Sequence, residues 1–235
     1  RLAWLLKFAS NCTTSQMMQT AKAKYQILQY SMELFKTVLG LDGLTCDFEK
    51  KGVLTVFKER KNFESHDASN AFLETFGLGG RRLEKAELFE LEPALSQDIA
   101  GAWLNTNDWH LRPDSLMTSW RNYLSQRGVV MEEQCNLLDF KTQGKTITGV
   151  HTSRGTFHAE SFIVATGAWA PQTLKQLKLK LPVEPGKGYS ITMERPGNCP
   201  QMPCSLYEKN MIVTPWKSGY RLGGTMEFSG YSTTL

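Results

Sequence analysis

The residues Phe162-Ile163-Val164-Ala165-Thr166-Gly167-Ala168-Trp169 decide the fold that we expect for this chain. An apolar run leads into a turn of small residues, and we predict a buried strand over residues 161–165. Because Gly167 has no side chain, the backbone there can approach a bound ligand closely. A strand that ends in Thr-Gly-Ala is also common without any ligand, so the context of this segment decides its meaning.

The block that precedes this segment has a specific order of predicted elements. A strand is expected at residues 101–104, followed by a polar loop. Pro113 then begins a helix that runs to about Gln126, because a proline in the first helical turn loses no hydrogen bond. Short strands separated by glycines follow, and we expect them at residues 129–131, 136–140, 146–150 and 156–158.

Both flanks of this block contain helical and strand patterns. Apolar residues recur three and four positions apart through residues 13–39, which predicts a helix that ends at Gly40. Further helices are expected at residues 62–76 and 84–91. Strands are expected at 52–57, 187–193, 211–214 and 220–225, with a tight hairpin at 217–219. The chain therefore has the pattern of an α/β (α+β) protein.

The composition is that of an ordinary globular protein with one large domain or two modest ones. The 235 residues are 41% hydrophobic and 21% charged, enough for a sizeable core. The net charge of +4 is scattered among acidic residues, so we expect no nucleic-acid partner. No apolar run approaches the roughly 18 residues that span a membrane. The five cysteines lack C-x-x-C spacing, which favours free thiols in a reducing, cytoplasmic compartment and no metal site.

In this context the segment 162–169 resembles the second FAD-contacting element of the D-amino-acid oxidase superfamily. Residues 108–113 are similar to the D-x-H-x-x-P loop of that family. Residues 185–190 resemble the P-x-K-G-Y-S segment of bacterial D-amino-acid dehydrogenases, and residues 220–230 resemble their R-x-G-G-x-x-E-x-x-G strand. The resemblance covers nearly the whole chain, and the last two segments favour the dehydrogenase branch over glycine and sarcosine oxidases.

The resemblance implies two interleaved domains. Residues 1–108 and 176–235 would form a substrate domain of mixed, largely antiparallel sheet with helices, and residues 109–175 would form part of an FAD-binding domain. The G-x-G-x-x-G motif and the C-terminal glycine-rich segment of the family are absent. We therefore expect an internal fragment that lacks both termini, with FAD bound by the full-length parent and not by the fragment.

The resemblance also implies cofactor-binding residues. The main chain at Leu137 would pair with the adenine, although this residue equally suits a core strand. The FAD-contacting turn itself would contribute Ala165, Thr166, Gly167 and Trp169.

On the substrate side, Arg221 is the expected partner of the α-carboxylate, because a guanidinium binds a carboxylate in a bidentate manner. The hydroxyls of Tyr189 and Tyr207 would join it. A surface position for Arg221 and simple packing of the tyrosines are the alternatives. His110 is expected near the flavin edge and not as a base, since hydride transfer needs little acid–base help, and no catalytic residue is assigned.

The implied reaction is oxidation of a D-amino acid, by hydride transfer to the flavin, to an imine that hydrolyses to a 2-oxo acid. The electrons would go to oxygen or to a respiratory acceptor, and the latter implies a peripheral position on the inner membrane. Three alternatives stay open: an amine oxidase like glycine or sarcosine oxidase, a 2-hydroxy-acid or polyol-phosphate dehydrogenase, and a non-catalytic ligand-binding fragment.

Overall fold

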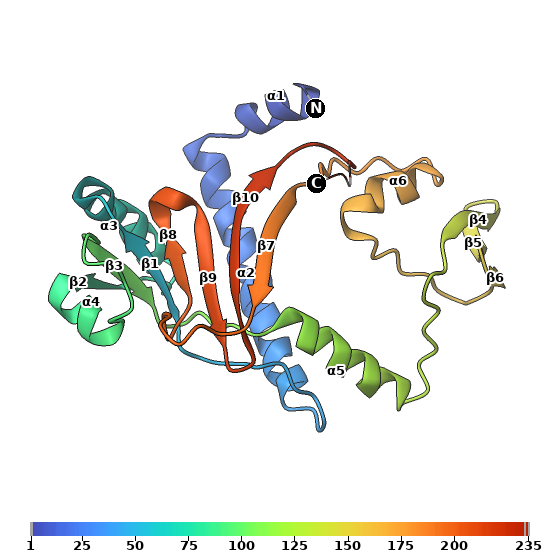
Figure 1. The fold of residues 1–235 in the computed structure, drawn as a ribbon. Coiled ribbons are helices and arrows are strands. Elements are labelled where there is room, and N and C mark those ends of the chain that lie inside the picture. The colour runs from blue at the N-terminus through green and yellow to red at the C-terminus, as the bar shows by residue number, and fades with distance from the viewer. Residues whose placement is uncertain (1, 233, 235) are drawn as a thin grey trace. The chain divides into compact units, whose positions relative to one another are not determined.

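The structure, a computed structural model, describes residues 2–232 and 234 and divides into two compact units (Figure 1). The larger unit comprises residues 18–127 and 188–226. The smaller unit comprises residues 1–17, 128–187 and 227–235. Each unit therefore combines segments that are distant in the sequence.

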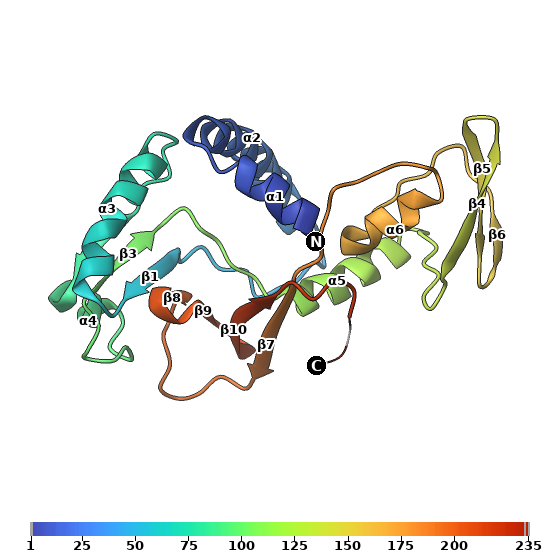
Figure 2. The same cartoon turned by 90° about the horizontal axis from the view of Figure 1, so that it is seen from above.

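A seven-stranded sheet dominates the larger unit (Figures 1 and 2). Strand β1 pairs in parallel with β8, whereas the pairs β2–β3, β1–β3, β8–β9 and β9–β10 are antiparallel. The prediction of a mixed, largely antiparallel sheet in an α/β fold is thus confirmed. In spatial order the strands are β2 (Arg81–Glu84), β3 (Gly101–Asn105), β1 (Val53–Phe57), β8 (Cys204–Leu206), β9 (Met211–Trp216), β10 (Gly219–Glu227) and β7 (Lys187–Met193).

Alternation along the strands supplies the core of the larger unit. Leu54 and Val56 of β1 are buried in the main apolar cluster, and successive side chains of a strand point to opposite faces. Phe57 belongs instead to a second cluster with Trp103 and Phe63. Both faces of β1 are therefore covered, which explains why this strand is apolar along most of its length.

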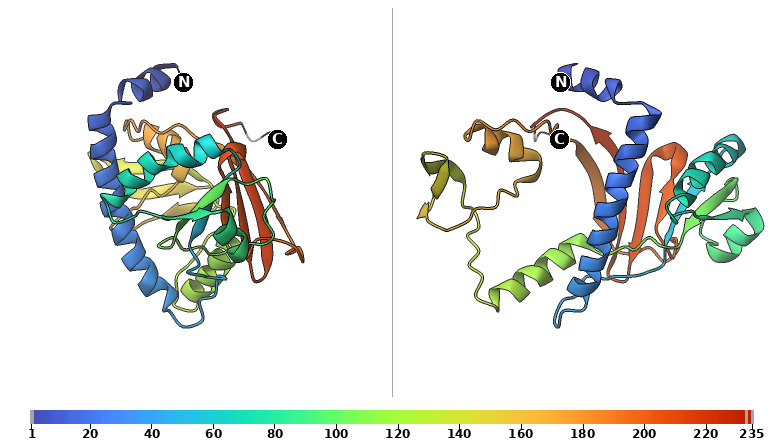
Figure 3. Two further views of the ribbon diagram at one scale, coloured as in Figure 1. Left: turned by 90° about the vertical axis from the view of Figure 1, so that its left-hand side faces the viewer. Right: turned by 180° about the vertical axis from the view of Figure 1, so that it is seen from behind.

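The helices of the larger unit lie where the apolar spacing predicted them (Figures 1 and 3). A proline at the first position of α5 follows Arg112, whose backbone is extended. No residue of α2 is fully buried, and the ring of Tyr25 lies 5.4 Å from that of Phe76. The helices are α2 (Thr14–Leu39), α3 (Arg60–Glu74), α4 (Lys85–Leu91) and α5 (Pro113–Ser125), with a 3-10 turn η2 (Tyr207–Lys209).

The smaller unit contains a three-stranded antiparallel sheet in the order β4-β5-β6 (Figure 1). Gly144 and Gly155 have positive φ angles at its two hairpin turns, which glycine adopts without steric cost. The strands predicted at 136–140, 146–150 and 156–158 are confirmed here. The elements are α1 (Leu2–Ser10), β4 (Leu137–Gln143), β5 (Thr146–Thr152), β6 (Gly155–Phe157), the 3-10 turn η1 (Gly167–Trp169) and α6 (Ala170–Lys175).

Two predicted strands are wrong. Residues 129–131 and 161–165 have no regular secondary structure, and Val130 and Ile163 are 80% and 93% exposed. A strand needs a neighbour to satisfy its backbone hydrogen bonds. Within the described part of the chain, neither segment has a strand paired with it. Their apolar composition alone was therefore insufficient to form a strand.

The two compact units are divided at other residues than the predicted domains 1–108, 109–175 and 176–235, whose boundaries stay a prediction. Helix α5 lies in the larger unit, where the Ser119 hydroxyl accepts a hydrogen bond from the Thr45 amide and donates one to the Gly43 carbonyl. Residues 176–187 lie in the smaller unit, where the Gln176 side chain donates to the Leu138 carbonyl. The roles of substrate and cofactor domain stay predictions.

Candidate functional site

A cavity of about 900 Å³ lies in the larger unit at the strands β7, β9 and β10, and we call it the β7–β10 cavity. It brings together Tyr189 and Arg221, which come from the two sequence segments that favour a dehydrogenase. Its volume is in the range of sites for small ligands, roughly 300–1,000 Å³. The lining residues are Gly188, Tyr189, Ser190, Lys209, Asn210, Ile212, Arg221, Gly223, Gly224, Thr225 and Met226.

Three glycines of the same two segments line this cavity. A Cβ atom added to Gly223 would lie 3.9 Å from Cβ of Ser190, and one added to Gly188 would lie 4.0 Å from the Thr225 carbonyl oxygen. At Gly224 the backbone of Asn210 approaches closely, since an added Cβ would lie 3.1 Å from its carbonyl oxygen. Gly224 thus has a steric role in this part of the sheet, whereas an added Cβ at Gly188 or Gly223 would make only ordinary contacts.

The guanidinium of Arg221 is held by its surroundings. Its Nε donates a hydrogen bond to the Thr192 hydroxyl oxygen at 2.8 Å. The guanidinium carbon lies 4.9 Å from the centre of the Trp216 ring, and Nη2 lies 3.8 Å from Oδ1 of Asp114. The side chain is 28% exposed. Arg221 is therefore a restrained, partly buried cation, and its role in binding a carboxylate stays a prediction.

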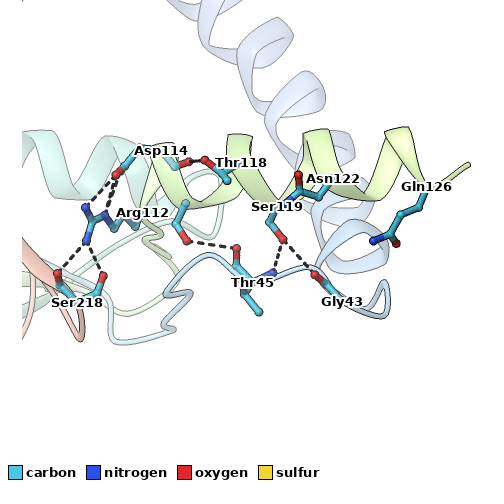
Figure 4. A pocket seen from close by; sticks show the side chains of 10 residues that line it. Gly43, Thr45, Arg112, Asp114, Thr118, Ser119, Asn122, Gln126 and Ser218 are labelled. Carbon is cyan, nitrogen blue, oxygen red and sulfur yellow. Dashed lines mark hydrogen bonds and ion pairs between the residues drawn. The ribbon is translucent and has the colours of Figure 1, made fainter. Parts of the chain in front are cut away.

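Asp114, in the first turn of α5, interacts mainly with a second arginine (Figure 4). Arg112 donates to both of its carboxylate oxygens, and also to the backbone and hydroxyl oxygens of Ser218. Burial raises the pKa of Asp114, but the hydrogen bonds and charge of Arg112, the backbone amide of Asp114 itself and the charge of Arg221 together hold the pKa below its usual value. Asp114 is thus a carboxylate at neutral pH, with Arg112 as its principal partner.

The network around Arg112 lines a separate polar pocket of about 510 Å³ along α5 (Figure 4). The side chains of Thr118, Ser119 and Asn122 face this pocket from the helix. Arg221 does not line it.

Two of the predicted substrate residues do not line the β7–β10 cavity. Tyr207 lies in η2, and its ring is 4.8 Å from that of Phe57. The buried side chain of His110 has Nε2 at 3.5 Å from Glu49, and the two residues also form a backbone bridge. Burial lowers the pKa of His110, and the nearby charge of Glu49 only partly offsets this. The cavity therefore combines Arg221 with Tyr189 alone among the predicted substrate residues.

The predicted cofactor residues lie together in the smaller unit. Ala165, Thr166, Gly167 and Trp169 are all exposed. Gly167 has a φ of +54°, and a Cβ added to it would meet no atom within 4 Å. This open stretch of backbone fits the close approach of a flat ligand such as a flavin nucleotide.

Leu137, the fifth predicted cofactor residue, is the first residue of β4. It is partly buried, which agrees with a strand residue whose contact with a ligand would be through the main chain. Gln176, just after α6, donates a hydrogen bond to the carbonyl of the neighbouring Leu138. The strand that carries Leu137 and the helix that follows Trp169 are thereby linked within one unit.

Sequence reasoning missed the residues that restrain Arg221. Thr192 and Trp216 are distant from Asp114 in the sequence, and only the pairing of strands and the start of α5 bring them to the guanidinium. The one available signal was the strand pattern itself, which placed Thr192 two residues after the segment 185–190 on the same predicted strand.

The described residues also bear on metal binding and on membrane insertion. Among them, no three His, Cys, Asp or Glu side chains are grouped so as to hold a metal ion. In the same part of the chain, no helix has both the length and the apolar character needed to cross a membrane.

Comparison with protein families shows a match over most of the chain. The family described as FAD dependent oxidoreductase (DAO) matches residues 8–235. The chain is 29% identical over 244 aligned residues to a D-amino acid dehydrogenase of Neisseria meningitidis serogroup C / serotype 2a, covering 100% of the chain and 57% of that protein. It is 27% identical to a D-amino acid dehydrogenase of Vibrio cholerae, again with 57% of the relative covered. The chain thus spans little more than half the length of these relatives.

Solved structures share the fold. The glycine oxidase of Bacillus cereus superposes with a TM-score of 0.74 at 20% identity, over 93% of this chain and 59% of that one. The L-proline dehydrogenase of P. horikoshii gives a TM-score of 0.73 at 21% identity, over 89% of this chain and 57% of that one.

Proposed function

The chain belongs to the DAO family of FAD-dependent oxidoreductases, and on that premise we propose that its parent protein oxidises D-amino acids. The observation that carries the proposal is the presence of Arg221 and Tyr189 in one cavity of the larger unit. The similarity to D-amino acid dehydrogenases supports the choice of substrate. The two residues also come from the sequence segments that first indicated the dehydrogenase branch.

Arg221 would bind the α-carboxylate of the substrate. A planar guanidinium forms two parallel hydrogen bonds with a carboxylate, and such charge-assisted bonds are strong when partly shielded from water. The Trp216 ring and the Thr192 hydroxyl hold this group in place, so less entropy is lost when a ligand binds. Tyr189, which also lines the cavity, stays a second candidate for contact with the substrate.

The residues expected to hold FAD in the parent are Leu137, through its main chain, and the open turn made by Ala165, Thr166, Gly167 and Trp169. When bound, the flavin supplies the acceptor for the hydride that leaves the substrate Cα. The role of this chain is to bind and orient the amino acid, and the imine product would hydrolyse to a 2-oxo acid and ammonia.

The electrons would pass from the parent enzyme to a respiratory acceptor at a membrane surface. This is the finer part of the proposal, and its support is the similarity to proteins named dehydrogenases. It implies a cytoplasmic protein that associates peripherally with the inner membrane.

A substrate panel on the full-length, FAD-loaded parent tests the proposal. D-amino acids, their L-enantiomers, glycine and N-methylglycine would be compared, with 2-oxo acid formation followed under an artificial electron acceptor and under oxygen alone. We expect D-amino acids to be oxidised fastest, and with the artificial acceptor. Faster oxidation of glycine or N-methylglycine, with oxygen as the acceptor, would instead indicate an amine oxidase. Absence of flavin absorbance from the parent protein would indicate a non-catalytic binding module.

A further inference from the structure

We propose that Thr192 is a positioning residue for carboxylate recognition. Its hydroxyl engages Nε of Arg221 and thereby leaves the two terminal nitrogens of the guanidinium for the ligand. This inference rests on the proposed function, because it takes the carboxylate of the substrate as the ligand of Arg221.

The position of Thr192 follows from the sheet. Strand β7, which carries Thr192, is the neighbour of β10, which carries Arg221. Thr192 Oγ1 accepts the hydrogen bond from Nε at 2.8 Å, a normal length for a bond to a charged donor. Because a threonine side chain is stiff about χ1, it offers its hydroxyl at a nearly fixed place.

The bond to Nε restricts how Arg221 can bind an anion. A guanidinium has two edges that are useful for a carboxylate: Nε with one terminal nitrogen, or both terminal nitrogens. The first edge is blocked by Thr192. At the second edge, Nη2 lies 3.8 Å from Asp114, which is too long for a hydrogen bond. The end-on edge of the fork is therefore the one that can take a carboxylate.

Asp114 does not compete strongly for that edge, because Nε of Arg112 donates to both of its oxygens at 2.9 and 3.2 Å and Nη2 of Arg112 lies 2.9 Å from Oδ2. Arg112 is in turn fixed by two hydrogen bonds to Ser218. The two arginines therefore have different roles. Arg112 neutralises the charge of Asp114, whereas Arg221, which Thr192 orients, has its terminal nitrogens available for the ligand carboxylate.

The chain supplies a matched control for Thr192. Strand β10 lies between β7 and β9, and on the β9 side Thr214 is the direct cross-strand partner of Arg221. Among the described residues, no hydrogen bond joins its hydroxyl to the Arg221 guanidinium. Replacement of either threonine by valine keeps the branched shape and removes only the hydroxyl, so a comparison of the two variants isolates the bond to Nε.

Calorimetric titration of the FAD-loaded parent with benzoate, and with uncharged benzamide, tests the inference without turnover. Loss of a hydrogen bond to a charged group changes affinity by about tenfold or more, so Thr192→Val is expected to weaken benzoate binding by about that factor. Benzamide binding should stay unchanged. Thr192→Ser should restore the wild-type affinity for benzoate, and Thr214→Val should not reduce it.

Three results would overturn the inference: wild-type affinity of Thr192→Val for benzoate, an equal loss for benzoate and benzamide, or an equal effect of Thr214→Val. Failure of the proposed function has a different signature. In that case the wild-type parent would oxidise no D-amino acid, whereas benzoate binding would still depend on Thr192 in the way described.

Discussion

Nη2 of Arg221 lies 3.8 Å from Oδ1 of Asp114, a carboxylate whose other oxygen lies 2.9 Å from Nη2 of Arg112. Arg221 therefore has an acidic neighbour without being hydrogen-bonded to it. A negative charge at this distance opposes the approach of an anionic ligand, even though it also attracts the guanidinium.

Asp114→Asn in the full-length enzyme is expected to tighten carboxylate binding. Two unit charges about 4 Å apart interact by about 1 kcal/mol in water, which corresponds to about fivefold in affinity at low ionic strength. Since Asp114 is half-exposed, added salt should reduce the gain. Titration with benzoate at low and high salt measures the change in affinity. Replacement of the exposed Asp42 by Asn is the control. Weaker binding by Asp114→Asn would show that the acid orients Arg221 more than it repels the ligand.

His110 is expected to make the stability of the larger unit depend on pH. Burial holds its pKa below the ordinary 6.5, against the opposing charge of Glu49. As the pH falls below about 6.5, the unfolded chain takes up a proton that the folded chain does not, so the free energy of unfolding decreases. Above that pH the contribution is fully present.

In the His110→Gln variant the free energy of unfolding should decrease less as the pH falls. Replacement of the exposed His151 by Gln should leave the pH dependence as in the wild type. Urea unfolding of the chain at a series of pH values between about 7.5 and 5 measures both. The partly buried His66, whose pKa is also lowered by burial, remains in every variant. Identical pH profiles for wild type and His110→Gln would exclude this role.

Gly101→Ala is expected to destabilise the larger unit. An added Cβ would lie 2.5 Å from Cζ of Phe63 and 2.9 Å from the Leu83 carbonyl oxygen, inside the core. Such overpacking costs about 1–3 kcal/mol. At Gly197 an added Cβ meets nothing within 4 Å, so Gly197→Ala is the matched control. Chemical denaturation of both variants decides the matter, and equal stability would mean that β3 and α3 can shift apart at little cost.

Sequence patterns predicted two kinds of element. These are helices with a local start signal, and strands whose two faces are both covered by apolar side chains. Pro113 marked the start of α5, and the apolar residues of 52–57 marked β1. They failed at 129–131 and 161–165, where apolar residues have no pairing strand within the described part of the chain. Composition indicates whether a segment can form a strand. Whether a neighbouring strand is present to form its backbone hydrogen bonds depends on the tertiary fold.

The candidate site shows the same limit. Motifs identified Arg221 and Tyr189, because each lies in a contiguous segment with characteristic glycines. Thr192, Trp216 and Asp114 contact Arg221 through strand pairing and the position of a helix start, which no short motif encodes. Tyr207 and His110 illustrate the converse, since a suitable residue type in a suitable segment did not bring either side chain into the cavity.

The chain by itself is expected to hold no FAD. It lacks a G-x-G-x-x-G segment, whose backbone and following helix bind the pyrophosphate in dinucleotide-binding folds. After incubation with excess FAD and gel filtration, the absorbance spectrum of the chain should show no flavin. One equivalent of retained flavin would mean that the open turn at Gly167 and the strand at Leu137 suffice for tight binding.

The central claim is that Arg221 recognises the carboxylate of an amino acid, and steady-state kinetics of the full-length enzyme test it most directly. Removal of one partner from a partly buried charge pair costs about 2–4 kcal/mol. Arg221→Ala should therefore reduce kcat/KM for a D-amino acid by about 30-fold to 1,000-fold. Arg221→Lys should lose less but still be impaired, because an ammonium lacks the planar fork. Amines without a carboxylate should be far less affected, and near-wild-type kcat/KM of both variants with a D-amino acid would contradict the account.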